Sequence, residues 1–412
     1  MREYAFALLL RQNKPWLHLG YSQLTNSKRL DGIDLLRALA IFLVLMNHIN
    51  IRLLGAGIPY TDCLHPQVVH LLVWNSQLGV QMFFAVSGFL ITSISLRRWG
   101  SLTQVSLRDF YRLRFARIAP LLLLVLAVLS ALHLANVHHY VVTAKTGGLG
   151  RALLAALTFH VNVLEAHRGY LPGNWDILWS LSVEETFYLC FPVVCRLFGR
   201  SKLLLVILFS FVALGPFGRT AFAQGNEIWE EYSYLGGMEG IALGCLTALV
   251  VSHLHFLRLH FRILGAVGSA TIILSLVFSW QAYRGWLGRT GLNMTTLGLG
   301  TCMFIAATAQ SQWRSPKILW PLLSIGQYSY EVYLTHMFVV FACFDLFLNL
   351  GKRMPLVPVL FLVAILASGG LGALVASSYS EPLNRFLRGR PPASGKKLAP
   401  AIDAELAVTS EP

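Results

Sequence analysis

Charged residues are scarce in this sequence, and their scarcity excludes a chain that folds as an ordinary soluble domain. Only 13% of the 412 residues are Asp, Glu, Lys or Arg, and 55% are hydrophobic. Soluble domains carry about a quarter charged residues, and a single soluble core stops growing beyond roughly 250–300 residues. A helical bundle in lipid has no such limit, so we expect one membrane domain.

The sequence also lacks the patterns of several cysteine, metal and serine chemistries. Its six cysteines contain no CxxC pair, and all but Cys63 lie in apolar segments, so a disulfide framework is not expected. His253, His255 and His260 have no carboxylate or thiolate beside them, and we predict no metal site. No GxSxG elbow surrounds Ser87, which argues against a hydrolase nucleophile.

Ten segments have the roughly 20 mostly apolar residues that a spanning helix needs. They lie near 34–53, 78–96, 118–136, 178–198, 202–217, 234–252, 262–281, 293–311, 325–349 and 355–379. The run at 151–164 is shorter and fits a re-entrant or interfacial segment. The sequence therefore predicts an all-α, polytopic transmembrane bundle of about ten helices.

The net charge of +14 comes from short basic clusters between apolar runs, so we interpret it as membrane topology and expect no nucleic acid partner. Short cytoplasmic loops collect Lys and Arg. With the N-terminus inside, this rule is met by clusters near 97–117, 196–202, 258–262, 314–317 and 385–397. The loop at 218–233 is acidic and falls outside. Both termini are then cytoplasmic.

Three regions are expected along the chain. Residues 1–28 form a basic arm on the membrane surface, 29–390 form the membrane domain, and 391–412 form a disordered cytoplasmic tail. The apolar stretch Tyr4 to Leu10 is too short for a signal-peptide core, so the first spanning helix is expected to serve as an uncleaved anchor. No inverted repeat of the transporter kind is evident.

Arg37 and His48 are the first ionisable side chains placed where lipid is expected. They are 11 positions apart in the sequence, which puts both on one helix face roughly 16 Å apart. Arg37 is a candidate for holding donor phosphates, with Asp34 fixing its rotamer. His48 is a candidate base or acyl acceptor. Alternatively, Arg37 snorkels to the interface and His48 hydrogen-bonds another helix.

Arg114 and Arg117 lie one turn apart just before the third predicted span, with Pro120 close behind. Such a pair can clamp the phosphates of a nucleotide donor. It can equally be a positive-inside cluster that binds the head groups of anionic membrane lipid.

The fourth span begins with LWSLSVEETFY, which places Glu184, Glu185 and Tyr188 just inside its outer end. A carboxylate there needs a partner, and we expect one of them to act as an acid or base or to pair with His48 or an arginine. The other carboxylate is explained by the preference for acidic residues in the first turn of a helix, here after a cap at Ser182.

The ninth span carries SYEVYLTH, in which Ser329, Tyr330, Tyr333 and His336 follow one stripe. Such a stripe supports either packing or the site. In the second span, Ser87 and Gly88 form a small pair suited to close helix approach.

These elements, in this order, resemble the acyltransferase-3 family of integral membrane O-acyltransferases. The likeness runs from about Leu30 to Arg388. It rests on six motifs: DGIDLLRALAIFLVLMNHI, FFAVSGFLIT, the Arg114-x-x-Arg117 element, LWSLSVEETFY, IGQYSYEVYLTH and SEPLNRFL.

The resemblance implies transfer of an acetyl or other short acyl group from cytoplasmic acyl-CoA to an extracytoplasmic hydroxyl. The acceptor would be a glycan or glycolipid such as lipopolysaccharide, exopolysaccharide or peptidoglycan, and the location the bacterial inner membrane. Acyl-CoA is the donor substrate, and no bound cofactor is expected. The resemblance makes His48 the essential histidine, Arg37 its partner, Arg114 and Arg117 the acyl-CoA-binding arginines, and Glu185 the carboxylate of the site.

Many relatives carry a C-terminal SGNH hydrolase-like domain, whereas this sequence ends soon after its last span. We therefore expect direct transfer or a separate periplasmic transferase partner. We also hypothesise that 137–177 supplies acceptor contacts through Trp175, His160, His167 and Arg168. His48 would either take the hydroxyl proton or carry the acyl group, oriented by Glu185 or Glu184. The alternative function is a transporter or flippase without acyl transfer.

Overall fold

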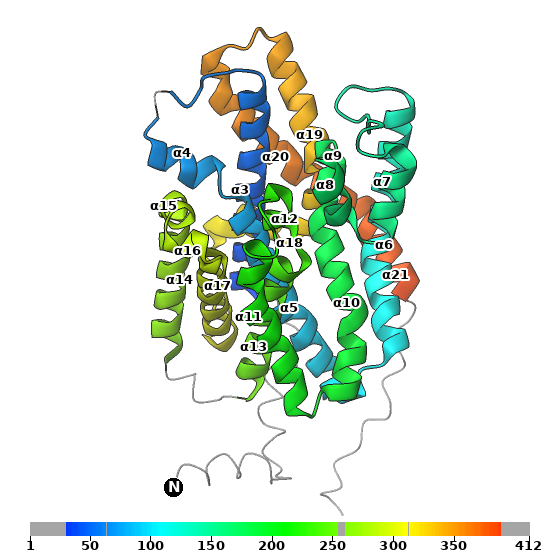
Figure 1. Cartoon of the computed structure of the whole chain (residues 1–412), viewed down its shortest axis with the longest axis vertical. Coiled ribbons are helices and arrows are strands. Elements are labelled where there is room, and N and C mark those ends of the chain that lie inside the picture. Colours follow the sequence, from blue (N-terminus) through cyan, green and yellow to red (C-terminus); the bar gives the residue numbers. More distant parts are fainter. Residues whose placement is uncertain (1–29, 63, 254–259, 312, 389–412) are drawn as a thin grey trace, which may run out of the picture.

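The protein is an all-helical bundle in the part of the chain that the computed structural model describes (Figure 1). The described residues are 30–62, 64–253, 260–311 and 313–388. The expected arm at 1–28 and tail at 391–412 lie outside these residues, as do Cys63 and His255. No strand occurs in the described ranges.

Nine helical segments within those ranges are long and apolar enough to cross a membrane. The main helix of each is α3 (Asp31–Gly55), α5 (Ser76–Trp99), α6 (Leu107–Leu134), α10 (Leu178–Phe198), α11 (Lys202–Arg219), α13 (Tyr234–His253), α17 (Leu292–Ser311), α19 (Ser329–Asn349) and α20 (Val357–Val375). The remaining predicted span, the seventh at 262–281, corresponds to the apolar helix α14 (Phe261–Val277), which has only 17 residues. The predicted polytopic bundle is confirmed; its orientation in the membrane stays a prediction.

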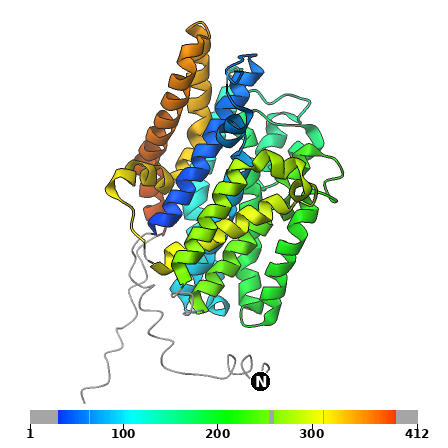
Figure 2. The same ribbon diagram turned by 90° about the vertical axis from the view of Figure 1, so that its left-hand side faces the viewer.

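Short helices connect the long ones at the upper end of the bundle in Figure 1. We call this the short-helix end, and it holds α4 (Pro66–Val73), α7 (Gly148–Leu157), α8 (Val161–Arg168) and α9 (Gly173–Asp176). The opposite end is called the basic end, because α5 ends there with Arg97 and Arg98 and α6 begins there. Figure 2 shows α3 crossing the molecule between the orange helices α19 and α20 and the yellow-green helices α14 and α17.

The third spanning helix starts earlier than predicted. We expected it near residue 118, with Arg114 and Arg117 in the segment before it, but α6 begins at Leu107 and contains both arginines. The hydroxyl of Ser106 caps its start by accepting a hydrogen bond from the backbone N–H of Asp109 at 3.3 Å. Hydropathy missed this start because the first turns are basic although they are helical.

The ninth predicted span, 325–349, is divided at Tyr328. Helix α18 (Trp320–Gln327) ends there, and α19 starts at Ser329. Gly326 explains the local packing, because a Cβ atom at this position would overlap the carbonyl oxygen of Asp34 on α3. The residues before the break therefore pack against α3 rather than extending α19.

The run at 151–164 does not form a span, as predicted. It is divided between α7 and α8, and Phe159 between them has a left-handed backbone with φ of 58°. Two short helices replace one long helix; α8 packs on α10, and α7 packs on α6 and α8 at the short-helix end.

The predicted close approach at Gly88 is confirmed. A Cβ atom there would overlap the Ile241 carbonyl oxygen of α13, and one at Gly244 would overlap the Ala85 carbonyl oxygen of α5. The two backbones touch because each helix offers a glycine to the other. This contact fixes α5, which lines the site described below.

Candidate active site

A cavity of about 550 Å³ lies among α3, α5, α6, α10 and α19 and reaches toward the basic end. Its apolar wall comes mainly from α5. Among the described residues that line it, Glu184 is the one acidic side chain. Six arginines of the same part of the chain line it as well: Arg37, Arg97, Arg98, Arg114, Arg117 and Arg388. The cavity is therefore strongly cationic.

Arg114 is held against the cavity wall by a carboxylate and a ring. Its Nη2 donates to Oε1 of Glu185 at 3.0 Å, and its guanidinium carbon lies 3.6 Å from the centre of the Tyr188 ring. The Tyr188 hydroxyl in turn hydrogen-bonds Ser87. The sequence predicted that a carboxylate of the fourth span could pair with His48 or with an arginine. In the structure, Glu185 pairs with an arginine, Arg114.

The predicted cap at Ser182 is wrong. Helix α10 begins at Leu178, so Ser182 lies inside it, where its hydroxyl donates to the Leu178 carbonyl and accepts from the backbone N–H of Val161. Glu184 and Glu185 are therefore not in the first turn of α10, and Glu184 lines the cavity.

Arg117 is paired in the same way with a carboxylate that the sequence reasoning missed. Its two terminal nitrogens donate to the two oxygens of Glu331 on α19, at 2.9 and 3.4 Å, and its guanidinium carbon lies 5.0 Å from the Tyr330 ring centre. Glu331 is only 1% exposed. It could have been found by the rule that selected Glu184, because it is an acid inside an apolar span.

The predicted pairing of Arg37 with Asp34 is confirmed, with Nη1 and Oδ1 3.8 Å apart. Arg37 shares the cavity with Ser329 and Tyr330. The Tyr330 hydroxyl donates to the backbone carbonyl of Ile118 at 2.9 Å, so this tyrosine also fastens α19 to α6.

His48 lies beside the cavity rather than in its wall. The ring of His336 on α19 is 5.2 Å from that of His48, and the Tyr333 ring is 5.8 Å from that of His336. Tyr333 itself lines the cavity, where its hydroxyl donates to the Ile177 carbonyl at 3.0 Å. The predicted stripe on α19 is thus split: Ser329, Tyr330 and Tyr333 line the cavity, and His336 contacts His48.

A second polar group, not predicted as such, lies toward the short-helix end. Asp176 accepts a hydrogen bond from the Tyr232 hydroxyl at 3.1 Å, and Arg52 carries the opposite charge nearby. Glu165 accepts from the backbone N–H of Leu171 at 3.0 Å. Burial, followed by the repulsion of Asp176, raises the pKa of Glu165 well above its ordinary value.

Trp175 does not have the exposure that the acceptor hypothesis for 137–177 requires. It is 0% exposed, so it offers no open face for stacking on a sugar. His160 lies at the surface and contacts the Thr158 hydroxyl at 2.6 Å.

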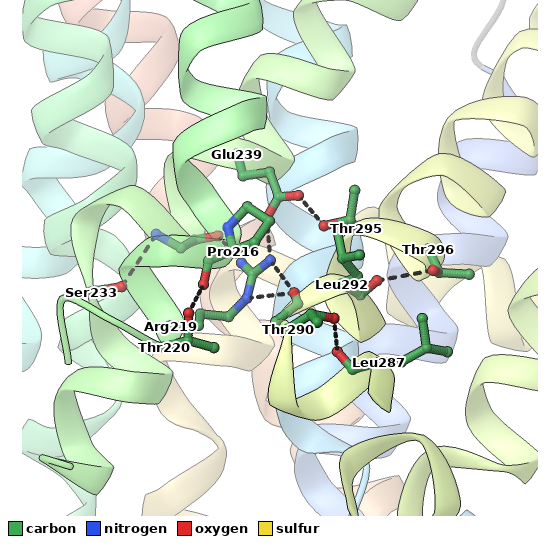
Figure 3. Close-up of polar contacts among 12 residues, drawn as sticks. Pro216, Arg219, Thr220, Ser233, Glu239, Leu287, Thr290, Leu292, Thr295 and Thr296 are labelled. Carbon is green, nitrogen blue, oxygen red and sulfur yellow. Dashed lines mark hydrogen bonds and ion pairs between the residues drawn. The ribbon is translucent and has the colours of Figure 1, made fainter. Parts of the chain in front are cut away.

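A buried ion pair between Arg219 and Glu239 lies outside the cavity wall and joins three helices (Figure 3). Arg219, at the end of α11, also donates to the carbonyls of Gly236 and Gly291, each at 2.9 Å. Glu239 on α13 accepts from the Thr295 hydroxyl of α17 at 2.5 Å. Sequence reasoning saw Arg219 only as a loop residue and missed Glu239.

The described residues contain no group of three or more His, Cys, Asp or Glu side chains that could hold a metal ion. The five cysteines within these ranges are free, and only Cys190 is exposed.

Comparison with known proteins agrees with this geometry. The acyltransferase-3 model, described as an acyltransferase domain, matches residues 30–375. The chain is 23% identical to the O-acetyltransferase OatA of Staphylococcus aureus (strain NCTC 8325 / PS 47), over 74% of this chain and 50% of that protein. It is 26% identical to the peptidoglycan O-acetyltransferase OatA of Listeria monocytogenes, over 75% of this chain and 49% of that one.

The chain spans about half the length of the curated relatives it matches. No solved structure matches it. The family match covers most of the membrane bundle and every residue that lines the cavity except Arg388. The chain therefore belongs to the acyltransferase-3 family of integral membrane proteins.

Proposed function

We propose that this protein is an O-acyltransferase that takes an acetyl or other short acyl group from acyl-CoA and delivers it to a hydroxyl of a glycan or glycolipid acceptor. The cationic cavity carries the proposal. Coenzyme A combines anionic phosphates with a long, mostly uncharged arm, and the cavity combines six arginines with an apolar wall. Guanidinium groups bind phosphate oxygens through paired, charge-assisted hydrogen bonds.

The arginines have two different tasks in this proposal. Arg97, Arg98 and Arg388 lie nearest the basic end and would meet the phosphates first. Arg114 donates a hydrogen bond to Glu185, and Arg117 donates to Glu331, so each arginine has some of its N–H groups already bonded. A carboxylate partner holds the guanidinium in one orientation, which favours recognition over simple charge attraction.

The thioester would lie at the inner end of the cavity, near Tyr333, with His48 beyond it. Two routes stay open. In one, His48 removes the proton of the acceptor hydroxyl, whose oxygen attacks the acyl carbon. In the other, a nitrogen of His48 takes the acyl group from sulfur and then yields it to the hydroxyl. In both, an ester forms and coenzyme A leaves as its thiol.

The side of the membrane and the acceptor class follow from the basic loops and the relatives. Basic loops favour the cytoplasm, so the donor cavity would open inward and the short-helix end would face outward. The relatives are named as O-acetyltransferases, one of them for peptidoglycan. We infer a bacterial inner-membrane location, with the acceptor reached directly or through a separate periplasmic partner.

The test is coenzyme A release from acetyl-CoA by the purified protein in lipid vesicles, with a peptidoglycan oligosaccharide as acceptor. Wild type should release the thiol, and His48→Ala and Arg37→Ala should each lose most of the rate while remaining folded. His253→Ala, at the exposed end of α13, is the control and should be fully active. Activity that survives in both variants would remove α3 from the mechanism. If neither the wild-type protein nor any variant releases coenzyme A, the transporter function would be favoured.

A further inference from the structure

His336 is a completely buried histidine with one ring nitrogen satisfied and the other not. It is 0% exposed, and its Nδ1 lies 2.6 Å from the backbone carbonyl oxygen of Tyr333. A carbonyl oxygen can only accept, so Nδ1 carries the hydrogen and donates it. In a neutral imidazole this leaves Nε2 with a free lone pair.

Nε2 of His336 is buried and has no hydrogen-bond partner among the described residues. Buried polar atoms nearly always have partners, and an exception calls for an explanation such as a catalytic role. The position of the ring supports that explanation. It touches His48 on one side, and it also contacts Tyr333, whose side chain lines the donor cavity.

The short helix α9 packs on α19 next to His336. It comes so close that a Cβ atom at Gly173 would lie 2.6 Å from the terminal methyl of Met337. The next two residues of α9, Asn174 and Trp175, are 1% and 0% exposed, and within the described ranges neither the amide of Asn174 nor the indole N–H of Trp175 has a hydrogen-bond partner. Unsatisfied buried polar atoms thus occur on both of the helices that meet at this point.

We propose that Nε2 of His336 is the base that receives the proton of the acceptor hydroxyl. The inference rests on the proposed function and deepens it by giving the two histidines separate tasks. A nitrogen of His48 that carries an acyl group cannot also remove a proton, whereas a second imidazole 5.2 Å away can. The carbonyl of Tyr333 fixes the tautomer of His336 that this task requires.

The proposed step balances as follows. The acceptor oxygen attacks the acyl carbon and a C–O bond forms, while the O–H proton passes to Nε2. The bond from the acyl carbon to its carrier, the donor sulfur or a nitrogen of His48, breaks and its electron pair stays on the carrier. The imidazolium of His336 then returns its proton to the thiolate or, through His48, to the aqueous phase. An alcohol needs this help because it is a weak nucleophile until its proton is removed.

The decisive variant is His336→Asn. Its side-chain amide can donate to the Tyr333 carbonyl from the position of Nδ1, but it has no basic nitrogen at the position of Nε2. His139→Asn is the matched control, because His139 packs on the same helix at Phe341 and its Nε2 is already partnered by Asp345 at 3.1 Å. His336→Gln is a second variant that fills the position of Nε2 with a group that is not a base.

The assay uses two acceptors with acetyl-CoA in lipid vesicles. One is a peptidoglycan oligosaccharide, which needs a base, and the other is hydroxylamine, whose nitrogen attacks without prior loss of a proton. Ester formation by His336→Asn should fall about 10²–10⁴-fold, whereas acetyl hydroxamate formation and the KM for acetyl-CoA should stay within a few-fold of wild type. His139→Asn should match wild type with both acceptors.

Each other outcome has a definite meaning. Equal loss with both acceptors, in His336→Asn and in His336→Gln, would make His336 a structural residue and overturn the inference. Full ester formation by either variant would overturn it too. A wild type that is inactive with both acceptors would overturn the proposed function itself, and this separates the two failures.

Discussion

Arg114 on α6 and Glu185 on α10 form an ion pair across the cavity wall, with 3.0 Å between Nη2 and Oε1 and the Tyr188 ring against the guanidinium. Glu185 is buried and Arg114 is partly buried. A buried pair costs desolvation energy to form, but removing one partner leaves an uncompensated charge and is strongly destabilising. The pair therefore fixes the direction of an arginine that lines the cavity.

Glu185→Gln tests this pair. The amide keeps the shape of the side chain but loses the charge, so we expect the free energy of unfolding in detergent to fall by about 1–3 kcal/mol. We also expect a higher KM for acetyl-CoA, because Arg114 is no longer oriented. Asp109→Asn is the control, since Asp109 pairs with Arg112 at the surface of the same helix and such pairs contribute about 0–1 kcal/mol. Equal effects of the two changes would contradict the assigned role.

The Arg219–Glu239 pair should support stability without taking part in catalysis. Arg219→Met leaves the carboxylate of Glu239 buried and unpaired, for which we expect a loss of about 3–5 kcal/mol. The double variant Arg219→Met, Glu239→Leu should recover much of that loss, since no charge remains. Denaturant unfolding of the single and double variants measures this coupling. If the double variant loses as much free energy of unfolding as the two single variants lose together, the two residues are not coupled.

The sequence predicted local features of this fold better than its long-range pairs. Hydropathy located the spans, and the Asp34–Arg37 pair followed from helical spacing alone. The partners of Arg114 and Arg117 could not be predicted, because Glu185 and Glu331 are 71 and 214 positions away along the chain. One sequence carries no record of which helices are neighbours.

The helix ends were missed for a different reason. Hydropathy reports the apolar part of a helix, so the basic first turns of α6 were assigned to a loop. The break at Tyr328 falls within a segment that was predicted as one span, and Gly326 just before it packs closely against α3. His336 was placed on a polar stripe, but its contact with His48 depends on how α3 and α19 pack together.

Gly88→Ala tests the contact of α5 with α13. The added methyl would overlap the Ile241 carbonyl oxygen, so the helices must separate. We expect a loss of about 1–3 kcal/mol, as for other overpacked interiors, and lower activity because α5 lines the cavity. Gly55→Ala is the control, because no atom of a neighbouring element in the described part of the chain lies within 4 Å of the added group. A thermal melt in detergent compares them, and equal melting temperatures would contradict the close packing.

Glu165 should make the stability of the protein depend on pH. Its pKa is raised in the folded protein by burial and by Asp176, so the folded state keeps a proton that the unfolded state loses at the ordinary carboxyl pKa. Between these two pKa values the unfolded state binds fewer protons, and the free energy of unfolding therefore falls as pH rises. The contribution of Glu165 is most favourable below the unfolded pKa and is lost as pH rises through the folded pKa.

Glu165→Gln removes this titration while keeping a neutral, hydrogen-bonding side chain. The variant and wild type should melt at similar temperatures near pH 4, and the variant should be the more stable at pH 8, with the gap widening in between. Glu227→Gln, at an exposed position in α12 (Glu227–Tyr232), should follow wild type at every pH. A gap that is constant with pH would mean that the pKa of Glu165 is the same in the folded and unfolded states. In that case the hydrogen bond from the backbone N–H of Leu171 would offset the effect of burial on that pKa.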